Sequence, residues 1–138
     1  MAAVRARVSA GHVGALWRSA LERVWTFLAT RDDLRPAGHN IFVYHRPRER
    51  GEPMTVEFGV EVAGAFEGEG EIEPTSTPSG QAATVRVEAI GDLGMAYTAI
   101  EAWFRATGRS PAGVSWEVYG DPGDDPGTFP IEVFSLLA

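Results

Sequence analysis

The feature of this sequence that most restricts its fold is an internal duplication. Residues 11–17, Gly-His-Val-Gly-Ala-Leu-Trp, match residues 91–97, Gly-Asp-Leu-Gly-Met-Ala-Tyr, at an offset of 80 positions. Residues 36–38 and residues 111–113 both read Pro-Ala-Gly, at an offset of 75 positions. The Val-Tyr pairs at 43–44 and 118–119 share that second offset. A repeat inside one chain predicts a supersecondary unit that is built twice.

The pattern of apolar residues predicts the same order of elements in both copies. The first copy has alternating or β-branched runs at 4–8, 41–45 and 55–63, and a helical pattern at 15–30. The second copy has such runs at 83–89, 115–119 and 131–136, and a helical pattern at 95–107. Each copy therefore reads strand, helix, strand, strand. The Gly- and Pro-rich stretch 64–80 is predicted to be a solvated connector with one short edge strand.

Aromatic and aliphatic residues recur at helical spacing in both predicted helices. The first stripe consists of Trp17, Leu21, Val24, Trp25 and Leu28. The second stripe consists of Ala96, Ala99, Ile100, Trp103 and Phe104. Such stripes usually face the core. Replacing Trp25 with alanine is therefore predicted to destabilise the fold.

These elements predict one α+β domain that spans residues 1–138. Repeat 1 covers about 4–63, the connector 64–80 and repeat 2 about 81–137. The expected architecture is a curved antiparallel sheet of about eight strands, with two helices on one face and a central groove. The duplication implies a pseudo-twofold axis, with Phe42 and Glu117 on paired or adjacent strands close to it. A junction between repeats is a natural place for a pocket.

Composition restricts the functional class. The chain has 12 basic and 19 acidic residues and a net charge of −7, which argues against direct nucleic acid binding. It has no cysteine and no apolar run long enough for a membrane span or a signal peptide, so we expect a cytoplasmic protein without membrane contact. The scattered histidines and the acidic residues of 67–73 and 121–125 lack ligand spacing, so we expect no metal and no cofactor.

The run Trp116-Glu117-Val118-Tyr119 carries the most specific chemical signal. On a strand, Glu117 and Tyr119 share one face, and the residues beside them share the other. A carboxylate among aromatic rings suits a cationic or polarised apolar ligand. An exposed carboxylate on an edge strand, or one paired with an arginine, is the alternative reading of the same run.

The sequence resembles the GyrI-like, or effector-binding, domains, which occur alone and at the C-terminus of AraC-type and MerR-type multidrug regulators. The resemblance rests on Pro-Ala-Gly at 111–113, on Trp-Glu-Val-Tyr at 116–119, on Asp121-Pro122 and Pro126, and on the C-terminal strand through 131–133. It implies that Glu117 lies in a groove between the repeats and meets cationic aromatic compounds. The family often has His-x-Gly-x-Tyr before its second helix, and residues 88–93 lack that tyrosine.

The predicted ligand contacts follow from the resemblance together with the duplication. They are Glu117, Tyr119, Phe42, Tyr44, Trp17, Tyr97 and Trp103. The leading functional prediction is a stand-alone domain that binds hydrophobic, drug-like compounds, with a regulator or DNA gyrase as a further protein partner. An enzyme remains open as an alternative, because some family members hydrolyse cyclopropane-bearing DNA-alkylating natural products, and Glu117 and Tyr119 would then be catalytic. A gyrase-inhibiting interaction protein is the third reading.

Overall fold

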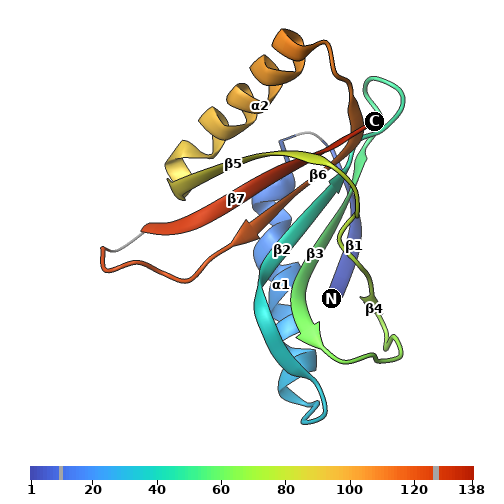
Figure 1. Ribbon diagram of the computed structural model, residues 1–138. Coiled ribbons are helices and arrows are strands. Elements are labelled where there is room, and N and C mark those ends of the chain that lie inside the picture. Colours follow the sequence, from blue (N-terminus) through green and yellow to red (C-terminus); the bar gives the residue numbers. More distant parts are fainter. Residues whose placement is uncertain (10, 126–127) are drawn as a thin grey trace. The chain divides into compact units, whose positions relative to one another are not determined.

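The computed structural model describes residues 1–9, 11–125 and 128–138, together with the backbone but not the side chains of 35–37. The chain forms two compact units, Met1–Thr77 and Pro78–Ala138 (Figure 1). Pro126, which carries part of the resemblance, lies outside the described residues. Each unit is described by itself below.

The first unit combines one helix with four antiparallel strands. Its elements are β1 (Ala2–Val8), α1 (Val13–Ala29), β2 (Arg35–His45), β3 (Met54–Ala63) and β4 (Ile72–Pro74). The strand order is β4-β1-β3-β2, so the short β4 is the edge strand predicted within the connector. The α1 helix packs on β1 and β3. Val4, Phe58 and Phe42 lie directly opposite one another across β1, β3 and β2, and all three are buried.

The second unit repeats this plan with three strands. Its elements are β5 (Ala82–Ala89), a 3₁₀ turn (Ile90–Asp92), α2 (Leu93–Thr107), β6 (Pro111–Tyr119) and β7 (Thr128–Leu137). The strand order is β6-β7-β5, and all pairs are antiparallel. The α2 helix packs on β5 and β7, and its buried residues Ala96, Ile100 and Phe104 meet Ile131 and Val133 of β7. Gly108 ends α2 in the left-handed conformation, with φ of 68°, which glycine adopts readily.

Strand pairing follows the same rule in both units. The first strand pairs with the third, and the third pairs with the second. A register shift interrupts the second strand between Pro36 and Asn40 in one unit and between Pro111 and Ser115 in the other. The two interrupted segments, 36–40 and 111–115, are related by the offset of 75 positions found in the sequence. The predicted strands began only after these Pro-Ala-Gly segments, at residues 41 and 115. These starts are wrong, because both segments belong to strands that the shift interrupts.

The helix stripes were predicted correctly at their centres and wrongly at their edges. In α1 the buried residues are Ala20, Leu21, Val24, Phe27 and Leu28. Trp25 is 40% exposed, and its indole N–H donates to Asn40 Oδ1 over 3.1 Å. Trp103 of α2 is equally exposed. The predicted core role of Trp25 is therefore wrong, because this indole lies at the border of the packed face, where it meets a polar partner.

The predicted α+β class with antiparallel strands and two helices is confirmed. The described residues contain seven strands, compared with the eight or so predicted. The central groove, the pseudo-twofold axis and the placement of Phe42 near Glu117 concern both units and stay predictions. No helix among the described residues is long and apolar enough to cross a membrane.

Candidate ligand-binding site

Glu117 is a buried carboxylate near the C-terminal end of β6. It is only 2% exposed and lies opposite Val133 of β7. On the other face of the strand, the indole of Trp116 stacks on Phe134 with ring centroids 5.1 Å apart. The alternation along 116–119 therefore separates the carboxylate from this stacked pair. A buried carboxylate is costly unless hydrogen bonds stabilise it.

Two phenol groups supply hydrogen bonds to Glu117. The hydroxyl of Tyr97 on α2 donates to Oε2 over 2.5 Å, and the hydroxyl of Tyr119 on β6 donates to Oε1 over 2.6 Å. Each carboxylate oxygen thus accepts a short, charge-assisted hydrogen bond from a neutral donor. Both tyrosines are half-buried and also pack against the apolar core of the unit. The carboxylate of Glu117 is thus held between two phenol hydroxyls.

Tyr119 is held in its protonated form. Burial is the largest cause that raises the pKa of its hydroxyl above the ordinary value of 10.0, and the nearby charge of Glu117 raises it further. A tyrosinate beside this carboxylate would place two negative charges together in a poorly hydrated site. The hydroxyl therefore stays a hydrogen-bond donor at neutral pH, which suits holding a carboxylate and does not suit accepting a proton.

We expect Tyr119 to resist ionisation in alkaline solution. Because its pKa is raised in the folded state, its contribution to stability is present below pH 10 and is lost as the pH rises further. Tyr119 should therefore add nothing to the tyrosinate absorbance of the native protein at pH 11, and Tyr119→Phe should leave that absorbance unchanged. In urea the same substitution should remove one third of the absorbance, since the chain has 3 tyrosines. A loss of absorbance in the native variant would contradict this assignment.

The first unit carries the same helix-to-strand contact with different chemistry. Trp17 and Phe42 occupy the positions equivalent to Tyr97 and Glu117, and their ring centroids lie 6.3 Å apart. Phe42 also meets Phe58 edge to face at 5.0 Å. Tyr44, equivalent to Tyr119, is half-buried. The duplicated plan thus holds a polar contact in one unit and an aromatic contact in the other.

The predicted site residues fall into separate groups. The structure brings Tyr97, Tyr119 and Glu117 into direct contact. Trp17, Phe42 and Tyr44 belong to the first unit, and their role at the same ligand stays a prediction. Trp103 lies six residues after Tyr97 and so on another face of α2. There it lines a cavity of about 380 Å³ between α2 and β5, together with Ala83, Thr84, Val85, Ala99 and Ile100.

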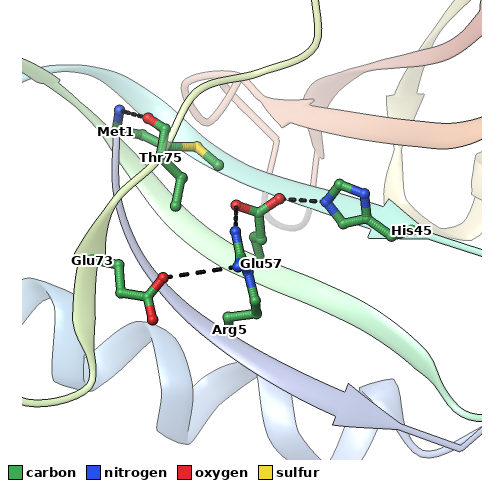
Figure 2. Close-up of polar contacts among 6 residues, drawn as sticks. All are labelled: Met1, Arg5, His45, Glu57, Glu73 and Thr75. Atoms are coloured by element: carbon green, nitrogen blue, oxygen red, sulfur yellow. Dashed lines mark hydrogen bonds and ion pairs between the residues drawn. The ribbon is translucent and has the colours of Figure 1, made fainter.

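A second buried carboxylate was missed by the sequence analysis. Glu57 alternates with apolar residues of β3 such as Phe58 and was not considered as a site residue, yet it is only 3% exposed. Its Oε1 accepts a hydrogen bond from Arg5 Nη2 over 3.4 Å, and its Oε2 lies 2.5 Å from His45 Nε2 (Figure 2). Arg5 also lies 4.0 Å from Glu73 of β4. This cluster joins β1, β2, β3 and β4 on the face opposite to that of Phe58, which indicates a structural role.

The acidic connector has ordinary surface contacts where it is described. Glu71 pairs with Arg23 of α1, and Glu73 approaches Arg5 of β1. The main-chain N–H of Thr75 donates to the carbonyl of Met1 over 2.9 Å, and the Met1 ammonium donates to the carbonyl of Thr75 over 2.6 Å (Figure 2). These contacts hold the segment alongside β1 and leave the carboxylates spread over its surface.

Comparisons with known proteins identify the fold. No family model matches the chain, and no curated protein matches it either. The EcmrR chain in a cryo-EM structure of an EcmrR–DNA complex matches with a TM-score of 0.79 and 19% identity, over 99% of this chain and 52% of that chain. A crystal structure of the EcmrR C-terminal domain matches with a TM-score of 0.76 and 19% identity, over 99% of this chain and 89% of that one. The chain thus has the fold of the EcmrR C-terminal domain and spans about half of the EcmrR chain in the DNA complex.

One sequence-based prediction is overturned by these comparisons. Net charge was taken to exclude direct nucleic acid binding, but the same fold is part of EcmrR, whose structure was determined in complex with DNA. The net charge of −7 averages over the whole chain and does not describe a local surface. The exclusion of nucleic acid is therefore wrong.

Proposed function

We propose that this domain binds a small hydrophobic ligand, cationic or polarised, at Glu117. The observation that carries the proposal is the buried carboxylate whose two oxygens accept hydrogen bonds from Tyr97 and Tyr119. The regulator effector-binding fold is consistent with a ligand-binding role. Membership of the GyrI-like family is part of the proposal, since the fold alone does not distinguish that family from related regulator domains.

The chemistry of the site favours a cation with apolar substituents. Phenol hydroxyls are neutral donors, so they stabilise the charge of a carboxylate through hydrogen bonds without carrying an opposite charge themselves. Low local polarity strengthens the attraction between that charge and a bound cation. Aromatic side chains such as Tyr97 and Tyr119 next to the carboxylate are of the type that attracts ammonium or aromatic cations through cation–π contacts. A strongly hydrated ion such as sodium would have to lose its water shell to reach Glu117, so we expect it to bind there only weakly.

Calorimetry with two matched probes tests the proposal. Benzyltrimethylammonium carries a shielded positive charge, and neopentylbenzene has the same shape without the charge. We expect the domain to bind the cation more tightly, by about tenfold or more, because a charge-assisted contact of this kind is worth about 1–3 kcal/mol. Equal affinity for the two probes, or tighter binding of the neutral one, would contradict a site organised by Glu117.

A further inference from the structure

The β5 strand has one unpaired edge in the second unit. It is the last strand of the order β6-β7-β5 and pairs only with β7 among the described strands. Its residues alternate between half-buried side chains, such as Val85 and Val87, and the exposed Thr84, Arg86 and Glu88. An open edge presents unpaired N–H and C=O groups that can pair with another strand.

The charges on this edge are complementary to themselves. Arg86 and Glu88 are exposed and have opposite signs, and within one chain Arg86 Nε donates to Glu88 Oε1 over 2.9 Å. They flank Val87 at equal distances along the strand. When two identical strands pair in an antiparallel way about Val87, each Arg86 lies opposite the partner's Glu88. Cross-strand pairs of opposite charge are favourable, whereas like charges in the same places are not.

We propose that β5 is a homodimerisation edge, at which a second copy of this chain adds its own β5 in antiparallel register about Val87. This inference does not depend on the proposed ligand. The backbone remains extended through Ala89, with φ of −148° and ψ of 150°, so Val85 can pair opposite the partner's Ala89. The edge-to-edge contact joins the sheets of two second units across a twofold axis.

Apolar groups next to the strand support the same register. Ile90 follows β5 directly and is 50% exposed, which is unusual for so large an apolar side chain. In this register it lies at the level of the partner's Thr84. Thr84 lines the cavity of about 380 Å³ between α2 and β5, whose walls are mainly aliphatic and include the half-exposed Trp103. In the dimer each Ile90 is covered by the partner's strand at the level of Thr84, where burial of its apolar surface is favourable.

The proposed contact is small, so the dimer should be weak and concentration-dependent. An edge of a few residues with two flanking apolar groups buries less surface than a standard stable interface of about 1,600 Å². We expect a dissociation constant in the micromolar range, on the order of 10–100 µM, which sedimentation velocity can follow over a concentration series. A chain that stays monomeric at every concentration up to the millimolar range would overturn the proposal, and Arg86 and Glu88 would then protect the edge from pairing.

Two charge-reversal variants give a sharper test. Arg86→Glu places four negative charges on the edge of its own homodimer, and Glu88→Arg places four positive charges there, so each variant alone should dimerise at least about tenfold more weakly than the wild type. Mixed in equal amounts, the two variants place opposite charges at every facing position, and we expect dimers to form again. A role of Arg86 and Glu88 within one chain cannot produce such rescue between two chains.

Controls separate this edge from other surfaces. Arg109→Glu makes the same change in net charge on an exposed residue outside β5 and should leave dimerisation unchanged. Circular dichroism of each variant shows whether it is folded before it is compared. The proposed register would be overturned if both charge-reversal variants dimerised as tightly as the wild type, or if mixing the two variants did not restore dimerisation.

Discussion

Replacing Glu117 with glutamine should weaken the binding of benzyltrimethylammonium by about 1–3 kcal/mol, which is between roughly fivefold and 150-fold in dissociation constant. Glutamine keeps the shape of the side chain and removes its negative charge, so packing changes little. The buried position of Glu117 makes the charge effective, since little water screens it. Isothermal titration calorimetry on both proteins measures the loss directly.

The neutral probe shows whether the affinity lost in Glu117→Gln is due to the missing charge of Glu117. Neopentylbenzene should lose much less affinity than the cation when Glu117 becomes glutamine. Glu132→Gln is a matched control, because Glu132 lies exposed on the neighbouring strand β7 and the substitution makes the same change of charge. The control should bind both probes like the wild type. If Glu117→Gln weakened both probes equally, Glu117 would act through packing, and the proposed cation site would be abandoned.

Replacing Phe58 with alanine should lower the free energy of unfolding by about 3–5 kcal/mol. Phe58 is 0% exposed at the centre of the first unit, where its ring meets Phe42 edge to face. Its removal leaves a cavity bounded by neighbouring strands, which a paired sheet cannot close easily. Urea unfolding followed by circular dichroism gives the free energy of unfolding for the variant and the parent.

Trp25→Ala is the matched comparison for Phe58→Ala. Both substitutions remove an aromatic ring from the first unit, but Trp25 is 40% exposed and keeps one hydrogen bond, to Asn40. We expect it to cost about 1 kcal/mol, as partly exposed residues usually do. If Trp25→Ala cost as much as Phe58→Ala, the exposed position of this indole would be wrong.

Periodicity predicted most of the fold because it reports which side chains must share a face. The centres of both helices and the repeated strand order followed from spacing alone. The spacing could not fix the width of each buried stripe, and so Trp25 was misplaced. Nor could it detect the register shifts, since proline and glycine at 36–38 and 111–113 indicate a turn as readily as an irregular strand.

Strand alternation also predicted part of the candidate site. Alternation along 116–119 put Glu117 and Tyr119 on one face, and their hydrogen bond agrees with this. The partnership with Tyr97 depends on how α2 lies on its sheet, and the helix pattern alone did not pair these two residues. Glu57 was missed because alternation tells which face a residue takes and does not tell what covers that face. Burial of a charge is a property of the tertiary structure.

The equivalent contacts Trp17–Phe42 and Tyr97–Glu117 have an evolutionary consequence. After a duplication, one copy of a contact can retain a purely stabilising role while selection acts on the other. Because the change needs only two side chains at a preserved helix–strand crossing, it leaves backbone pairing untouched. Under the proposed function, an exchange of two side chains at this crossing is enough to change the ligand chemistry while the backbone scaffold stays the same.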